Sequence, residues 1–153
     1  MIPEIERLQS EELLALVRIL DSTLNNTSLI LLFEIGGQKL LFPGDAQLEN
    51  WSYALRIYGK LLKGVTVYKV GHHGSLNATP KTLWKLFEHR APAGTPDRLT
   101  TMLSTLSGKH GSVDRGTEVP RKPLLDELEG SSVLFNTQDV RLRDLAAEVV
   151  LPL

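Results

Sequence analysis

The chain has 153 residues, of which 42% are hydrophobic and 23% are charged, and its formal net charge is −1. These values are typical of one soluble globular domain, and they exclude a disordered chain and a strongly basic nucleic-acid-binding domain. Cysteine is absent, which excludes disulfides, zinc fingers and a cysteine nucleophile. Any metal site must therefore use His, Asp or Glu.

The N-terminal residues and the apolar stretches predict a cytoplasmic protein with no membrane partner. Glu4, Glu6 and Arg7 make the N-terminus charged from its start, whereas a secretory signal needs a basic patch followed by an unbroken apolar run. The longest apolar stretch, residues 29–33, is far shorter than the roughly 20 residues that a membrane-spanning helix requires.

Hydrophobic periodicity predicts the elements of the first half. Residues 3–21 have apolar side chains at helical spacing and predict an amphipathic helix. Residues 29–33 and 39–42 flank Gly36-Gly37 and predict a buried hairpin. Residues 48–62 predict a helix with one buried face, because apolar side chains recur every three or four positions. That face carries Leu48, Trp51, Leu55, Tyr58 and Leu62. A second buried strand is predicted at residues 65–70.

The second half continues the alternation of helices and strands. Thr79-Pro80 predicts the start of a helix that ends near Arg90. The remaining predictions are a loop at 91–98, a strand at 100–106, an irregular segment at 107–123, a short helix from Leu124 closed by Gly130, and strands at 133–135 and 148–153. This order predicts an α/β fold, with a mixed sheet and helices packed on it.

Two short segments carry the residues with metal-binding chemistry, and each follows a predicted buried strand directly. They are Pro43-Gly44-Asp45 and Gly71-His72-His73-Gly74-Ser75. A carboxylate and imidazole nitrogens are ligands that Zn²⁺ or Mn²⁺ accepts when no thiolate is present. We therefore expect both segments to face one metal centre. The alternatives stay open: Asp45 also suits a turn whose carboxylate caps backbone N–H groups, and paired histidines also occur as polar loop residues.

Three motifs, in this order and spacing, resemble the second half of metallo-β-lactamase-fold hydrolases. They are NTSLILL at residues 26–32, LLFPGD at 40–45 and VYKVGHHGS at 67–75. The likeness is strongest to the hydrolase domains of bacterial DNA-uptake competence proteins. It covers residues 24–90 and extends more weakly to about residue 140, where SGKHG at 107–111 lies near a family Gly-His loop.

The resemblance implies a role for each matching residue. Asp45 would bridge two metal ions, and His72 would be a ligand of the second ion, with His73 as the alternative. The family chemistry is hydrolysis by a metal-bound hydroxide, which suits a phosphodiester substrate such as a nucleic acid. His110 would contact the substrate phosphate or protonate the leaving group, and it is equally explained as a solvated loop histidine.

The sequence also departs from the family pattern. Family members carry a His-x-His-x-Asp-His motif and one further histidine upstream, and this chain has no histidine before His72. The sequence therefore predicts half of an αββα sandwich in a single domain, residues 1–153. It divides into a leading helix at 1–23, a motif-bearing core at 24–90 and a C-terminal extension at 91–153.

Three explanations of the missing ligands remain open: a truncated reading frame, a first half supplied by another polypeptide, or loss of catalysis. The competing function is a noncatalytic module that keeps the fold for assembly or nucleic-acid contact. Because half a sandwich exposes a sheet face and an edge, we also expect the chain to form homo- or hetero-oligomers.

Overall fold

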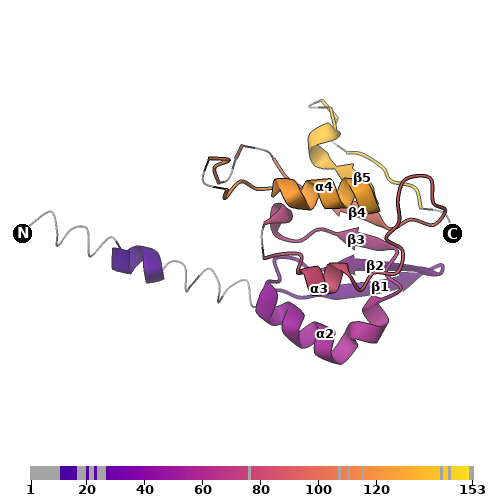
Figure 1. Ribbon diagram of the computed structural model, residues 1–153, viewed down its shortest axis with the longest axis horizontal. Coiled ribbons are helices and arrows are strands. Elements are labelled where there is room, and N and C mark those ends of the chain that lie inside the picture. Colours follow the sequence, from indigo (N-terminus) through magenta and orange to yellow (C-terminus); the bar gives the residue numbers. More distant parts are fainter. Residues whose placement is uncertain are drawn as a thin grey trace, which may run out of the picture.

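The computed structural model describes residues 11–16, 20, 23, 27–75, 77–106, 108–109, 111–114, 116–141, 143–144 and 146–151. Within these residues the fold is α/β, as predicted, with a five-stranded mixed sheet and helices packed on it (Figure 1). The strands are β1 (Leu31–Ile35), β2 (Gln38–Phe42), β3 (Val67–Lys69), β4 (Thr100–Leu103) and β5 (Val133–Asn136). The helices are α2 (Leu48–Leu62), α3 (Lys81–Trp84) and α4 (Lys122–Ser131), with short 3₁₀ turns η1 (His72–Gly74) and η2 (Thr137–Asp139).

The strands lie in the sheet in the same order as in the chain, from β1 to β5. β1 and β2 form the predicted hairpin and are antiparallel, whereas β2, β3, β4 and β5 are all parallel. The carboxyl ends of these four parallel strands therefore lie along one edge of the sheet. Leu31 pairs with Phe42, so the start of β1 lies at the same edge.

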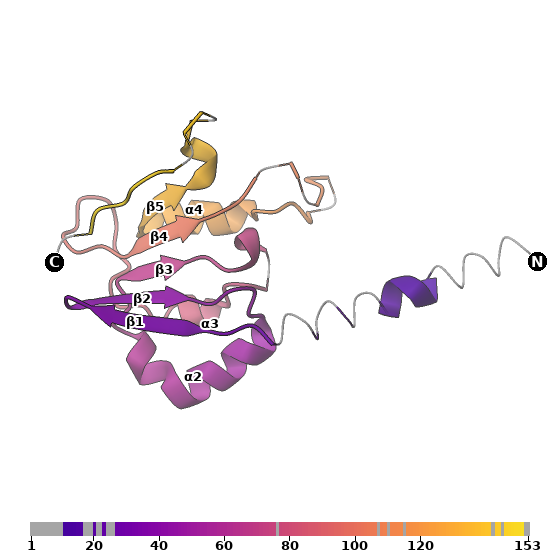
Figure 2. The same ribbon diagram turned by 180° about the vertical axis from the view of Figure 1, so that it is seen from behind.

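The three helices cover one face of the sheet, as the views from the two sides show (Figures 1 and 2). Leu41, Tyr68 and Leu103 point from the sheet into a single core that also contains Trp51 of α2 and Leu128 of α4. All five side chains have no measurable exposure. Burial of each large apolar side chain contributes about 1.5–3 kcal/mol, so this side of the sheet provides most of the stability of the fold.

The opposite face of the sheet is apolar and is partly exposed to solvent. On β1, the alternating side chains Leu31, Phe33 and Ile35 are 45%, 46% and 62% exposed, and Val133 on β5 is 51% exposed. The prediction of a buried hairpin is therefore wrong for β1. Its continuous apolar run suggested burial on both sides, but within the described part of the chain no helix packs on this second face (Figure 2).

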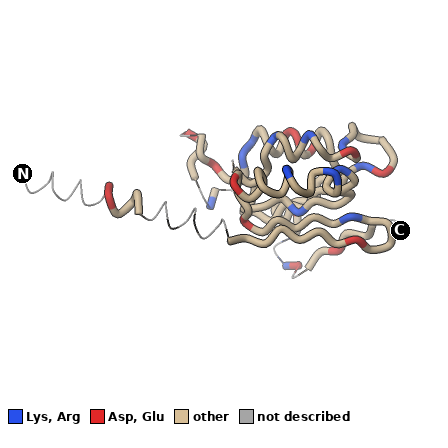
Figure 3. Tube along the Cα trace, turned by 90° about the horizontal axis from the view of Figure 1, so that it is seen from below, with Lys and Arg blue, Asp and Glu red and all other residues tan. Residues whose placement is uncertain are grey.

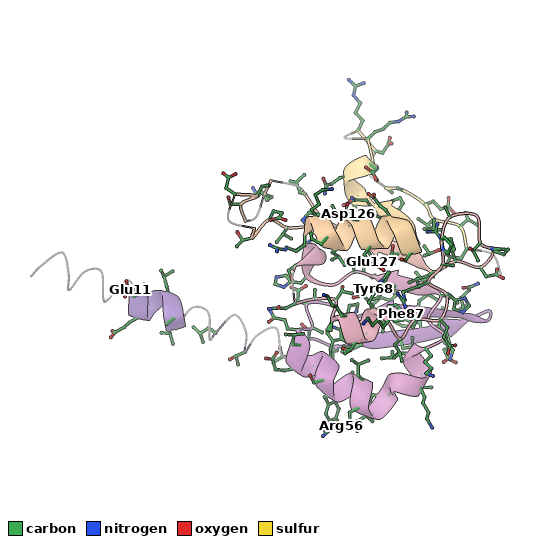
Figure 4. All side chains as sticks on the ribbon, viewed as in Figure 1. Glu11, Arg56, Tyr68, Phe87, Asp126 and Glu127 are labelled. Atoms are coloured by element: carbon green, nitrogen blue, oxygen red, sulfur yellow. The ribbon has the colours of Figure 1, made fainter. Side chains whose placement is uncertain are left out.

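Two predictions for helices need correction. The helix predicted at residues 48–62 is confirmed as α2, and Trp51 and Leu62 are buried, but Leu48 and Tyr58 of the predicted buried face are 47% and 51% exposed. The helix predicted to end near Arg90 is much shorter, since α3 ends at Trp84. After α3 the chain turns so that Phe87 enters the core, where its ring centroid lies 5.2 Å from that of Tyr68 (Figure 4).

The two ends of the chain differ in how far the predictions hold. Within the helix predicted at 3–21, the described residues 11–16 and 20 are helical, and residues 11–16 lie away from the sheet (Figure 1). The strand predicted at 148–153 is wrong for residues 148–151, which pair with no strand and expose Val150 to 81%. Residues 152–153 lie outside the described residues. Among helices built from described residues, none combines the length and the apolarity needed to cross a membrane.

Candidate functional site

The two segments predicted to carry metal ligands are in direct contact. Pro43-Gly44-Asp45 follows β2, and the turn that begins at Gly71 follows the neighbouring strand β3. A Cβ atom built on Gly71 would lie 2.9 Å from the carbonyl oxygen of Gly44 and 3.3 Å from Cγ of Pro43. Gly44 in turn lies against Ser28 and Leu29, which precede β1. The structure thus brings all three sequence motifs together at one edge of the sheet, where α/β folds commonly bind ligands.

The turn that bears the histidines has an unusual backbone. His72, His73 and Gly74 have φ angles of 40°, 53° and 80°, so all three are left-handed. This conformation costs a residue with a side chain about 1–2 kcal/mol. Hydrogen bonds from the Gly74 N–H to the Gly71 carbonyl (2.9 Å) and from the Ser75 N–H to the His72 carbonyl (3.0 Å) hold the turn. Such strained residues cluster at functional sites, so this turn is included in the candidate site.

Two buried side chains anchor the segment that follows this turn. The indole N–H of Trp51, on α2, donates to the carbonyl of Ala78 at 3.0 Å. The hydroxyl of Tyr68, on β3, lies 2.9 Å from the hydroxyl of Thr79. Burial raises the pKa of Tyr68 to about 12, despite this hydrogen bond. Trp51 and Tyr68 therefore connect the histidine turn to the core.

Asp45 is an exposed carboxylate beside a cationic side chain. Lys69, at the end of β3, donates from Nζ to the Val70 carbonyl at 3.0 Å. Burial lowers the pKa of Lys69, and the negative charge of Asp45 partly offsets this effect. The ends of the adjacent strands β2 and β3 and the turns that follow them therefore carry a carboxylate, an amine and two imidazoles.

The two histidines have different surroundings. His73 is exposed, and its Nδ1 lies 2.8 Å from the Ser104 carbonyl oxygen, so Nδ1 donates and Nε2 keeps its lone pair in the neutral ring. Its side chain lines a cavity of about 240 Å³ with Ser104, Thr105, Leu106 and Lys109. His72 is half-buried, and its Nδ1 is buried without a hydrogen-bond partner. The ring centroids lie 6.4 Å apart.

Glu118 and Arg121 pack beside the histidine turn, and the sequence analysis missed both. The N–H of Arg121 donates to the Gly74 carbonyl at 3.1 Å, and a Cβ built on Gly74 would lie 3.0 Å from Cβ of Pro120. The Glu118 and Arg121 side chains form an ion pair at 3.6 Å. Their charged side chains are the only signal in the sequence that could have indicated them, because the segment that carries them has no hydrophobic periodicity.

Among the described residues, four buried side-chain polar atoms lack a hydrogen-bond partner, and all four belong to the histidine turn or to the segment 118–121 that packs beside it. These atoms are His72 Nδ1, Ser75 Oγ, Glu118 Oε2 and Arg121 Nε. Buried polar groups are nearly always satisfied in folded proteins, so a concentration of exceptions indicates a place with a polar role. Residues 118–121 therefore belong to the candidate site together with residues 71–75.

The side chains of the described residues do not complete a metal site. Across the described part of the chain, no group of three or more His, Asp or Glu side chains is arranged to hold a metal ion. Asp45, His72 and His73 lie on two segments that are in contact, but their side chains are not arranged as the three protein ligands that a catalytic zinc site needs. His110 lies outside the described residues.

No protein-family model, curated protein or solved structure matches this chain. The likeness to metallo-β-lactamase-fold hydrolases therefore rests on the three motifs.

Proposed function

We propose that this chain supplies the half of a metallo-β-lactamase-type hydrolase that carries Asp45 and the histidine turn, and that the chain alone is inactive. The substrate class is a phosphodiester, such as a nucleic acid. The remaining ligands for Zn²⁺ or Mn²⁺ come from a second polypeptide that carries the His-x-His-x-Asp-His motif. The observation that carries the proposal is the contact between Gly71 and Gly44, which joins the two ligand-bearing segments.

The chemistry of this edge supports the proposal. Asp45 offers anionic oxygen, and His72 or His73 offers an imidazole nitrogen, a mixed set that suits Zn²⁺ and Mn²⁺. Lys69 adds a positive charge near Asp45, and a phosphodiester carries the opposite charge. A module with a purely structural role would need neither the histidine pair nor its strained backbone.

The exposed sheet face supports the proposal that a second polypeptide adds another layer to the fold. Sheets with helices on one face normally bury the other face against another layer. Here Leu31, Phe33, Ile35 and Val133 leave that face apolar and exposed. A second sheet packed against these side chains would bury them and would bring its own residues to the same edge.

A second candidate is a noncatalytic module that keeps the fold for assembly. It is favoured by the incomplete ligand set among the described residues. Under this alternative, Asp45 serves only as a turn residue and the histidine turn serves only as a connection between β3 and α3.

Complementation separates the two candidates. The chain is mixed with a polypeptide that supplies the His-x-His-x-Asp-His half, and hydrolysis of bis(para-nitrophenyl) phosphate is measured with Zn²⁺ or Mn²⁺. We expect activity only in the mixture and its loss with a chelator. Asp45→Asn should reduce the rate by several orders of magnitude, because it removes the negative charge of the ligand. His72→Ala and His73→Ala show which histidine matters.

Asp126→Asn is the matched control, because Asp126 is an exposed carboxylate on α4 that pairs with Lys122 at 3.0 Å. It should leave the rate unchanged. A mixture in which Asp45→Asn and His72→Ala are as active as the unchanged chain would refute the assignment of this site and would favour the noncatalytic module.

A further inference from the structure

A small cavity lies directly after β4, the strand that pairs in parallel with β3. Its volume is about 240 Å³, and the residues that line it are His73, Ser104, Thr105, Leu106 and Lys109. Because β2, β3 and β4 run in the same direction, the cavity lies at the sheet edge that also carries Asp45 and the histidine turn. The candidate site therefore extends from the ends of β2 and β3 to the end of β4.

His73 connects this cavity to the histidine turn. Its Nδ1 donates to the Ser104 carbonyl oxygen at 2.8 Å, which fixes the ring against the segment that follows β4. A molecule bound in the cavity would therefore contact the histidine turn as well as this segment. The proposed function places one histidine of the turn on a metal ion and assigns nothing to the cavity.

Hydrogen bonds hold the segment after β4 in place. The Thr105 N–H donates to Oγ1 of Thr137 at 3.0 Å, and the Thr137 hydroxyl donates to the Thr105 carbonyl at 3.1 Å. The Lys109 N–H donates to the Leu106 carbonyl at 3.3 Å, so these two lining residues belong to one turn. A cavity whose walls are fixed in advance loses less conformational entropy when a ligand binds.

Lys109 gives the cavity a positive charge. None of the ion pairs between described residues involves Lys109, and the described lining residues include no carboxylate. Lys and Arg positions are interspersed with Asp and Glu positions over the described chain (Figure 3), so attraction of an anion depends on local groups such as this one. An ammonium beside hydroxyl-bearing residues, here Ser104 and Thr105, suits the oxygens of a phosphate.

We propose that this cavity binds the phosphate next to the scissile one in a nucleic-acid strand. The inference rests on the proposed function, and it gives the same substrate a second contact. The scissile phosphate lies at Asp45 and the histidine turn, and the neighbouring phosphate lies beside Lys109. Leu106 offers an apolar surface to the sugar. The chain therefore binds a strand with two adjacent phosphates more tightly than a simple diester.

Binding of two dinucleotides to the isolated chain tests this inference. TpT contains one phosphodiester, and pTpT carries an additional 5′-phosphate. Nuclear magnetic resonance titrations with a chelator present measure both affinities without metal or hydrolysis. We expect pTpT to bind roughly tenfold more tightly than TpT, because only pTpT places a second phosphate beside the ammonium. The amide signals of Thr105 and Lys109 should shift with pTpT.

Substitution of Lys109 locates the second phosphate. Lys109→Ala should remove most of the preference for pTpT, and Lys109→Arg, which keeps the charge, should retain it. Lys60→Ala is the matched control, since Lys60 is an exposed lysine in the last turn of α2. It should leave the preference unchanged. Inorganic phosphate is the second probe, and it should shift the same amide signals less than pTpT at equal concentration.

Equal affinities for pTpT and TpT would overturn the inference, as would a preference that survives Lys109→Ala. If inorganic phosphate shifts these signals as strongly as pTpT, the cavity takes free phosphate and not a strand, which also overturns it. The result is separate from the complementation experiment. Hydrolysis by the mixture without a preference for pTpT refutes the cavity alone, whereas a preference without hydrolysis refutes the proposed hydrolase and leaves a strand-binding site.

Discussion

Gly71 and Gly44 lie so close that the position of a Cβ on Gly71 is only 2.9 Å from the Gly44 carbonyl oxygen. Real Cβ atoms do not approach a carbonyl oxygen this closely, so only glycine at position 71 allows the turns after β2 and β3 to touch. The φ angle of Gly71 is −71°, which any residue adopts. The requirement for glycine is therefore the close approach alone.

Replacing Gly71 should test this contact directly. We expect Gly71→Ala to lower the free energy of unfolding by about 1–3 kcal/mol, because the methyl group forces the two turns apart. Gly59→Ala is the control, since Gly59 lies in α2 with no atom within 4 Å of its built Cβ. It should raise stability by about 0.5–1 kcal/mol, as alanine favours the helix. Denaturant unfolding measures both, and equal effects of the two substitutions would contradict the contact.

Trp51 should stabilise the histidine turn through its indole N–H. In Trp51→Phe, the carbonyl of Ala78 loses its partner, and the smaller ring leaves space in the core. We expect a loss of roughly 2–4 kcal/mol in unfolding free energy. Amide exchange at Ala78, whose N–H donates to the Ser75 carbonyl, should become faster. Tyr53→Phe, at an exposed position on the same helix, should change neither quantity.

Tyr68 should make the fold sensitive to alkaline pH. Its pKa is raised from 10.0 to about 12 by burial, so the folded state holds the phenol proton more tightly than the unfolded state. The stabilisation is present below pH 10 and is lost as the pH rises toward 12, by about 3 kcal/mol in total. Urea unfolding across alkaline pH should show this loss in the unchanged chain. A Tyr68→Phe chain that loses stability just as steeply would show that other groups cause it.

The isolated chain should bind Zn²⁺ only weakly. Asp45 and one histidine leave a zinc shell incomplete, so elemental analysis after dialysis should find less than one ion per chain. Weak binding in a calorimetric titration should decrease with Asp45→Ala and stay the same with Asp126→Ala. Two retained ions per chain would show that other side chains complete the shell.

Much of the fold could be predicted from the sequence, because local patterns set it. The spacing of Trp51 and Leu62 predicts α2, and Gly36-Gly37 between two apolar runs predicts the hairpin. The burial of β1 could not be predicted, since a run of apolar residues does not show whether a second layer covers them. The strand predicted at residues 148–153, which include Val150, is wrong for a similar reason. Residues with high β propensity form a strand only where another strand pairs with them.

The candidate site could be predicted where its residues follow strands. Asp45 and His72 each come directly after a strand, and parallel pairing of β2 and β3 brings their segments together. Glu118 and Arg121 could not be predicted in the same way. They reach the site only because residues 118–121 fold back on Gly74, a contact between distant segments that leaves no local pattern.

The agreement between strand order and chain order affects how the chain acquires its structure. Each parallel strand joins the edge formed by the strand just before it, so no strand has to insert between two that are already paired. On the ribosome, the sheet can extend step by step as each segment emerges, and the contacts at each step span a moderate length of chain. Asp45 and the histidine turn both precede β5 in the chain, so the segments that carry them can meet before β5 joins the sheet.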